Sequence, residues 1–178
     1  METNYNRETN MEFYDVVKAR RSIRGYKNDP VPEDALKRIA EAVSLAPSAC
    51  NIQPWSFRVV VNPALLKKIC AVYSAPWLAE APAIAIALGN SGVCWKRLDG
   101  EPIIPVDIGI AMEHLVLAAA AEGLGTCWIC AYDMAKMNKV LNILQPWNAY
   151  AITPLGYANV PPDKIKRKPV DDVFKIIK

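Results

Sequence analysis

Residues 106–122 are the most apolar segment of the chain, and any fold must bury most of them. Their few polar residues form no helical stripe, so a helix here would be apolar almost all round and unsuited to a protein surface. Asp107, Glu113 and His114 lie within the segment and make it a costly membrane span. We therefore expect a helix that is buried at the centre of a domain or between two subunits, and that ends at Gly123.

The length and composition of the chain fit one soluble domain. With 178 residues, 52% of them hydrophobic and 22% charged, we expect a single domain over 11–178 behind a flexible N-terminal extension over 1–10. The net charge of +3 is too small to imply nucleic-acid binding. Five cysteines, an odd number, and no apolar signal-peptide core favour free thiols, a cytoplasmic protein and no membrane association.

The apolar periodicity predicts a mixture of helices and strands. Helical spacing, with prolines and Asp133 as start signals, predicts helices over 13–19, 32–46, 63–73, 106–122 and 134–146. Period-two alternation and short apolar runs predict strands over 55–61, 82–88, 126–129 and 150–155. In the strand 82–88, larger aliphatic residues alternate with alanine, so we expect the alanine face under a closely packed helix. Pro154 is expected to end the last strand or to place it at an edge of the sheet.

The connection over 89–105 shows no periodicity and is longer than ordinary connections. We interpret it as a lid or binding loop, with disorder as the alternative. Trp95 lies in this loop, where its ring could stack on a planar substrate. Trp55 and Trp128 fall in predicted strands and are expected in the core.

Three arginines and a serine fall within 20–24, directly after the first predicted helix. Guanidinium groups match phosphate oxygens two at a time, and the Ser22 hydroxyl adds a short neutral donor. The cluster can therefore hold a phosphomonoester. The alternative is a solvated basic turn, which is common for short runs of basic residues.

The loop over 45–55 contains two prolines, two amide side chains and little charge. The side chains of Asn51 and Gln53 each offer a donor and an acceptor on one planar group, which suits the edge of a heterocycle. An ordinary turn needs neither amide.

Taken in order, four motifs make the chain resemble the nitroreductase family of flavoproteins: RRSIR at 20–24, APSACNIQPW at 46–55, GLGTCWI at 123–129 and LGY at 155–157. A late basic stretch at 166–169 accompanies them. The resemblance implies an α+β fold with a central, mostly antiparallel sheet flanked by helices. It also implies an intertwined homodimer with FMN at two interface sites and 106–122 as the central helix.

The resemblance assigns the phosphate end of FMN to Arg20, Arg21 and Ser22, together with Arg167. Arg24 would approach the pyrimidine end of the flavin ring, where a cation favours the negative charge of the reduced state. The absence of a Gly-x-Gly-x-x-Gly stretch favours FMN over FAD.

The resemblance assigns the ring itself to residues of two further motifs. Asn51 would hydrogen-bond the isoalloxazine edge, and Pro47, Ser48 and Gln53 would line the site from the partner subunit. The backbone around Ile129 and Cys130 would face the reactive N5 region. Cys50 and Cys130 stand where family members commonly have glycine, so they are expected to narrow the pocket.

The implied activity is hydride transfer from NAD(P)H through FMN to planar, electron-poor small molecules such as nitroaromatics or quinones. No catalytic side chain is required. One alternative is a protein that binds or stores FMN without turnover. The other is a thiol oxidoreductase that uses the Cys127-Trp128-Ile129-Cys130 motif, although that motif lies in a predicted strand. A metal site is not expected, because His114 is the single histidine and no second Cys-x-x-Cys completes four ligands.

Overall fold

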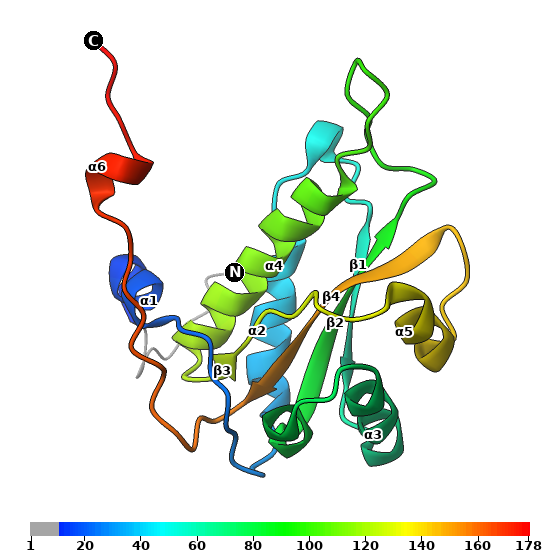
Figure 1. The fold of residues 1–178 in the computed structure, drawn as a ribbon, viewed down its shortest axis with the longest axis vertical. Helices are drawn as coiled ribbons and strands as arrows, with labels where there is room; N and C mark the ends of the chain where they lie inside the picture. The colour runs from blue at the N-terminus through cyan, green and yellow to red at the C-terminus, as the bar shows by residue number, and fades with distance from the viewer. Residues whose placement is uncertain (1–10) are drawn as a thin grey trace, which may run out of the picture.

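The structure, a computed structural model, describes residues 11–178, so the extension predicted over 1–10 lies outside the described residues. The fold is α+β, as the sequence predicts (Figure 1). The strands are β1 (Trp55–Val60), β2 (Ala83–Asn90), β3 (Gly125–Thr126) and β4 (Trp147–Gly156). The α-helices are α1 (Phe13–Ala19), α2 (Glu33–Ser44), α3 (Pro63–Val72), α4 (Ile104–Ala121), α5 (Met134–Leu141) and α6 (Val170–Val173). Two short 3₁₀ helices are η1 (Ala49–Asn51) and η2 (Pro76–Glu80).

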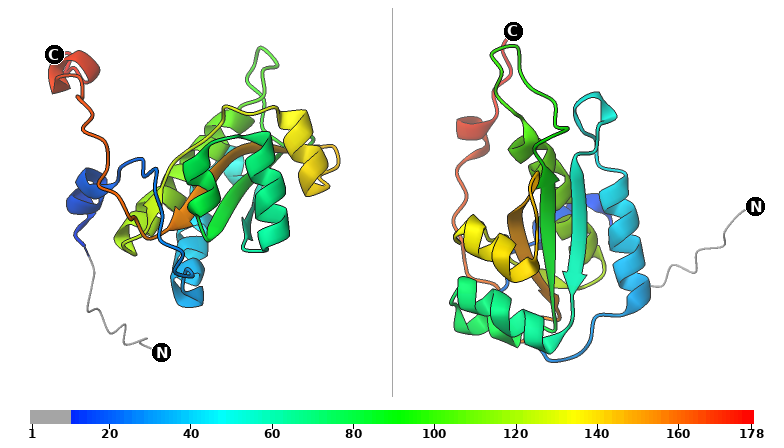
Figure 2. Two further views of the ribbon diagram at one scale, coloured as in Figure 1. Left: turned by 60° about the horizontal axis from the view of Figure 1, so that its bottom comes forward. Right: turned by 90° about the vertical axis from the view of Figure 1, so that its right-hand side faces the viewer.

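The four strands form one antiparallel sheet in the order β1-β2-β4-β3, with helices on both faces (Figure 2). The alternation in β2 decides which helix covers which face. Ala83 and Ala85 pack with residues of α2 and α4, while Ile84, Ile86 and Leu88 pack with residues of α3 and α5. The predicted alanine face under a close helix is therefore confirmed, since small side chains let α4 approach the sheet.

Helix α4 is the core helix that its composition predicts, although it begins two residues before the predicted start. It is long and apolar enough to cross a membrane by length and composition alone, but 44% of it is buried inside the domain. Gly123, with φ of 72°, ends the helix: its N–H donates to the carbonyl of Ala120, and Leu124 N–H to that of Ala119. Arg38 of α2 clamps this end through a two-point contact with Glu122, at 2.7 and 2.6 Å.

The expectation for Pro154 was wrong. It lies inside β4, opposite Ile84, in a strand that has neighbours on both sides. The ladder to β3 adapts around it, because Cys127 N–H donates to the Thr153 hydroxyl at 3.0 Å. Pairing resumes only at Ile129, which bridges to Ile152. The predicted strand over 126–129 is accordingly reduced to a two-residue β3 and this isolated bridge.

Two other boundaries differ from the prediction. Helix α5 ends at Leu141 because Asn142 adopts a left-handed backbone, and Leu144 is 80% exposed instead of extending the apolar stripe. Strand β2 continues to Asn90, so the connection before α4 is shorter than predicted.

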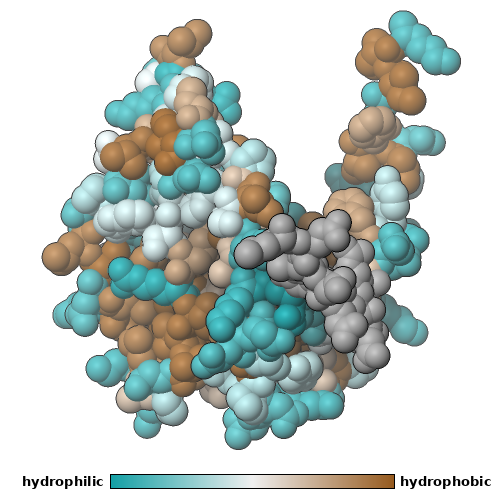
Figure 3. All heavy atoms as spheres, turned by 180° about the vertical axis from the view of Figure 1, so that it is seen from behind, coloured by the Kyte–Doolittle hydropathy of each residue, from teal (hydrophilic) through white to brown (hydrophobic). Residues whose placement is uncertain are grey.

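The C-terminal tail leaves the body of the domain and carries α6 away from it (Figure 1). In Figure 3 it stands apart from the rest of the surface and alternates apolar with polar spheres. Its large apolar residues are 66–88% exposed: Val170, Val173, Phe174, Ile176 and Ile177. Such a series of exposed apolar residues is unusual on the surface of a soluble domain.

Candidate functional site

The arginine cluster lies on an extended segment that is fixed to β3. Ser22 bridges Thr126 in a parallel arrangement, and Ile23 N–H donates to the Thr126 carbonyl at 2.8 Å. Arg20, Arg21 and Ser22 are half-buried. A cavity of about 220 Å³ opens beside the two arginines and is lined by residues that include Ala120 and the glycine-rich turn 123–126. The cluster therefore has a defined concave surface.

Two of the arginines contact the start of the C-terminal tail. Arg24 Nη1 forms an ion pair with Asp163 Oδ2 at 2.9 Å, and Arg21 Nη2 donates to the Asp163 carbonyl. Both Arg24 and Asp163 are exposed, so this pair contributes little to stability. Arg167, four residues further along, is also exposed.

The loop that carries the amide side chains is built from strained backbone. Cys50, Asn51 and Gln53 have φ of 50 to 52°, the left-handed region that costs most non-glycine residues about 1 kcal/mol or more. Gln53 N–H donates to the Ser48 hydroxyl at 2.9 Å, and Ala49 N–H donates to Asp107 Oδ1 at 3.1 Å. These bonds hold the loop open, with the side chains of Asn51 and Gln53 exposed.

The two parts of the predicted site lie at opposite ends of α4 (Figure 1). The amide loop contacts Asp107 in the first turn of the helix, whereas the arginine cavity is lined by Ala120 near its end. Thirteen residues of α-helix span about 20 Å. One chain therefore does not bring Arg20 and Asn51 together around a single small ligand.

Ile129 and Cys130 lie beyond β3, where Ile129 is buried and Cys130 is exposed. Trp128, predicted in the core, is instead 39% exposed and donates its indole N–H to the Cys130 sulfur at 3.1 Å. The short strand ends before this residue, so the alternation that would have buried it is lost. Trp128 also lies close to Gly109 on the outer side of α4.

The thiol-oxidoreductase alternative has little support in this geometry. Cys127 is 5% exposed, and burial raises the pKa of its thiol against the opposing effects of Arg24 and Ser22. An attacking thiol needs the opposite, a lowered pKa and access to solvent. Cys127 follows β3 and is not at a helix N-terminus, which removes the usual source of activation.

Trp95 lies in an ordered excursion between β2 and α4. The excursion closes on itself through the bridge of Lys96 with Pro102 and through Ile103 N–H, which donates to the Trp95 carbonyl at 3.1 Å. The Trp95 side chain is half-buried. The segment projects at the end of α4 that also carries the amide loop (Figure 1).

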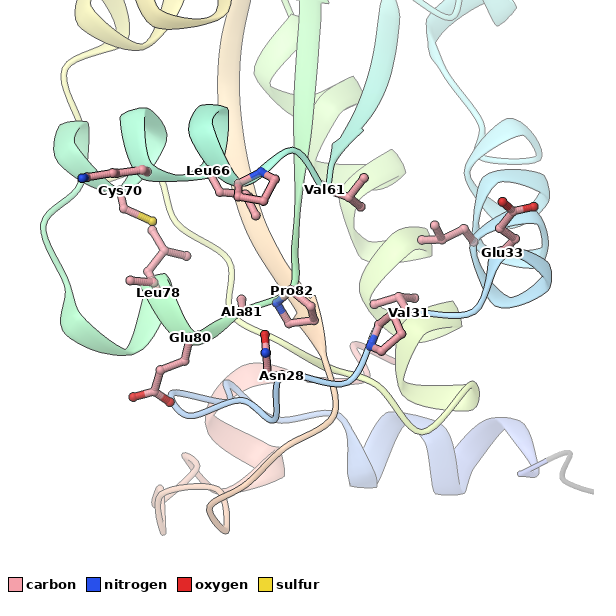
Figure 4. Close-up of a pocket in the computed structure, with 15 residues that line it drawn as sticks. Asn28, Val31, Glu33, Val61, Leu66, Cys70, Leu78, Glu80, Ala81 and Pro82 are labelled. Atoms are coloured by element: carbon pink, nitrogen blue, oxygen red, sulfur yellow. The ribbon is translucent and has the colours of Figure 1, made fainter.

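A larger groove of about 860 Å³ opens elsewhere, between the start of α2, the start of α3 and η2 (Figure 4). Its lining is mostly apolar, with Val31, Leu66 and Leu78 among the residues. Its charged members are Glu33, Lys67 and Glu80. None of the residues predicted to bind the cofactor lines it. Within 11–178 there is also no group of histidine, cysteine and acidic residues arranged to hold a metal ion.

Sequence reasoning missed two residues of this region. Asp107 was considered only as an obstacle to membrane insertion, and Trp128 only as a core residue. An acidic residue in the first turn of an otherwise apolar helix was a usable signal for Asp107. No comparable signal identified Trp128, because its exposure depends on where β3 ends.

Comparisons with known proteins find relatives over most of the chain. The model of the nitroreductase family matches residues 17–83 and 71–157. A protein of Methanothermobacter thermautotrophicus, named as a candidate NADH dehydrogenase/NAD(P)H nitroreductase, is 32% identical over 152 residues, 83% of this chain and 78% of the relative. The crystal structure of a nitroreductase family protein from Clostridium novyi has a TM-score of 0.77 at 33% identity, covering 84% of this chain and 86% of the other. An FMN-dependent nitroreductase from Clostridium difficile has a TM-score of 0.73 at 26% identity, covering 89% and 92%.

Proposed function

Because the chain belongs to the nitroreductase family, we propose that it is an FMN-dependent oxidoreductase of the nitroreductase type. NAD(P)H is the proposed electron donor, and flat, electron-poor small molecules such as nitroaromatics or quinones are the proposed acceptors. The observation that carries the proposal is the pair of half-sites at the two ends of α4. One half-site offers guanidinium groups, which bind a phosphate. The other offers planar amides, which can hydrogen-bond the edge of the flavin ring.

The residues present fit the group when each half is considered separately. The arginine cavity of about 220 Å³ is smaller than the roughly 300–1,000 Å³ usual for small-molecule sites, so it suits a phosphate end and not a whole flavin nucleotide. Arg20 and Arg21 supply charge there, and the Ser22 hydroxyl supplies a donor. The exposed amides of Asn51 and Gln53 fit the alternating donors and acceptors of the ring edge.

Bound FMN would supply the redox chemistry, taking hydride from the nicotinamide and passing electrons to the acceptor. The chain supplies placement and charge. Arg24 would put a cation near the pyrimidine end, moderated by its ion pair with Asp163. Trp128 and Cys130 would border the space for the acceptor, and Trp95 would narrow its approach from the excursion over 91–103. A side chain at Cys50 or Cys130 would restrict bulky acceptors.

A homodimer is part of the proposal. If two copies pack their α4 helices in antiparallel fashion, the amide loop of one copy approaches the arginine cavity of the other, and two complete sites form. The outer face of α4 supports this arrangement, since Val106 is 50% exposed and Leu117 half-buried on a helix with few charges. The exposed apolar tail supports it as well. Within residues 11–178, β1 pairs only with β2, so its outer edge offers the tail a place to bind.

The test is anaerobic reduction of the FMN-loaded protein by NADH and by NADPH, followed by a panel of oxidants. We expect the flavin absorbance to bleach with one donor and to return with a quinone or nitroaromatic compound. A protein that binds FMN but is not reduced by either nicotinamide would instead support the storage alternative. A protein that takes up no FMN would reject the proposal. The cytoplasmic location is proposed on the same footing, from the free thiols.

A further inference from the structure

We propose that Asp107 is a positioning residue that fixes the strained loop 48–53 in the shape required for flavin binding. The inference rests on the proposed function, because the purpose of the loop is taken from it. Asp107 lies in the first turn of α4, is 1% exposed, and accepts the Ala49 N–H at 3.1 Å through Oδ1. It does not touch the reacting groups and acts only through the loop.

The carboxylate has few stabilising contacts in the core. Its second oxygen, Oδ2, is buried and meets no hydrogen-bond donor within residues 11–178. A buried carboxylate loses its hydration, and the N-terminal end of the helix dipole offsets only part of that loss. The bond that Oδ1 accepts from the Ala49 N–H is therefore the one hydrogen bond of this carboxylate within residues 11–178. A residue kept for core stability would be apolar here.

The loop needs such a contact because its conformation is not one that these residues prefer. Of the four non-glycine residues with left-handed backbone in the described chain, three lie in this loop: Cys50, Asn51 and Gln53. Ala49 directly precedes Cys50, the first left-handed residue, so a bond from its N–H fixes the entry to the left-handed segment. The Ser48 hydroxyl, which accepts from Gln53 N–H, fixes the exit. Losing the entry bond leaves the loop free to relax.

Asp107→Leu separates positioning from stability. Leucine is similar in size and cannot accept the bond, so we expect an unfolding temperature that is unchanged or higher. Hydrogen exchange of a peptide covering 46–54 should be at least tenfold faster, and FMN binding about tenfold weaker. Asp107→Asn keeps an accepting oxygen while removing the charge. The hydrogen-exchange rate of the loop and the FMN affinity should stay within about threefold of the wild-type values. This variant therefore distinguishes the effect of the hydrogen bond from that of the charge at the helix N-terminus.

The matched control is Arg38→Met, which breaks the clamp to Glu122 at the opposite end of the same helix. It should lower the unfolding temperature while leaving loop exchange and FMN affinity unchanged. If Asp107→Leu leaves loop exchange at the wild-type rate, or loses affinity only in proportion to stability as Arg38→Met does, the inference is overturned. If the wild type binds no FMN, the proposed function fails, and the exchange measurement still decides whether Asp107 fixes the loop.

Discussion

The groove between α2, α3 and η2 and the cavity beside the arginines differ in what one chain completes. The groove has about 860 Å³, is mostly apolar, and is formed entirely by one copy (Figure 4). The arginine cavity has about 220 Å³, and the amides that would complete it lie about 20 Å away along α4. The larger space thus contains none of the predicted cofactor residues, and the smaller one contains two.

If the flavin binds between two copies, cavity size in one copy is a poor guide to where it binds. A site shared between two copies appears in one copy as two incomplete surfaces, each with only part of the required groups. Such a site is recognised by complementary chemistry at two places that symmetry can bring together. The following predictions test whether the two half-sites, and not the groove, bind the flavin.

The largest effect is expected from breaking the proposed dimer at the outer face of α4. Leu117→Glu places a charge on this apolar face, so we expect a monomer that binds FMN at least 100-fold more weakly, because each half-site then lacks its other half. Sedimentation velocity and flavin titration measure the two effects. Leu117→Met is the matched control and should remain a dimer that binds FMN. A monomer with wild-type affinity would place the whole site within one chain.

A smaller loss is expected at the phosphate end. Arg20→Ala removes one charge-assisted contact, worth roughly 1.5–3 kcal/mol, so FMN affinity should fall by about 10- to 150-fold. Lys18→Ala is the control, since Lys18 is a nearby exposed cation whose one ion pair in the described part of the chain is with Asp15, at 3.2 Å. Equal losses in both variants would indicate a general effect of charge. Unchanged FMN affinity in Arg20→Ala would favour the alternative, in which the cluster is a solvated basic turn.

Much of the fold was predictable because the buried faces of helices and strands have apolar residues at regular spacing in the sequence. Alternation in β2 assigned both faces of the sheet, and the apolar composition of α4 placed it in the core. The position of Pro154 was not predictable in this way. The sheet tolerates it because the Thr153 hydroxyl accepts the Cys127 N–H, and no local sequence pattern encodes that bond.

The candidate site was predictable in its residue types but not in its arrangement. The motifs identified Arg20, Asn51 and their neighbours as groups of suitable chemistry. That these groups lie at opposite ends of α4 depends on tertiary packing, as does the contact of Asp107 with Ala49. The assignment of cofactor roles to Arg24, Arg167 and the other named residues stays a prediction.

A moderate effect on assembly is expected from the tail. A chain that stops after Pro169 lacks five large, exposed apolar residues that the second copy would bury. We expect the dimer dissociation constant to rise about tenfold or more, since burying even 60 Å² of apolar surface contributes about 1.5 kcal/mol. The double variant Lys175→Ala with Lys178→Ala keeps the apolar residues and should dimerise normally. A truncated protein with an unchanged dissociation constant would show that the tail binds elsewhere.

The smallest effect is expected in thiol alkylation, which compares the groove with the two half-sites in one experiment. Cys50 and Cys130 are exposed near the predicted flavin ring, and Cys70 is half-buried in the groove. Burial raises the pKa of Cys70, so its thiolate fraction at pH 8 is low and its labelling by iodoacetamide should rise as the pH increases beyond the ordinary thiol range. Adding FMN should slow the labelling of Cys50 and Cys130 severalfold and leave that of Cys70 unchanged at every pH. Mass spectrometry of the labelled peptides measures all three thiols in one sample, so each protein molecule carries its own control. Protection of Cys70 with no protection of Cys130 would move the flavin into the groove and reverse the comparison.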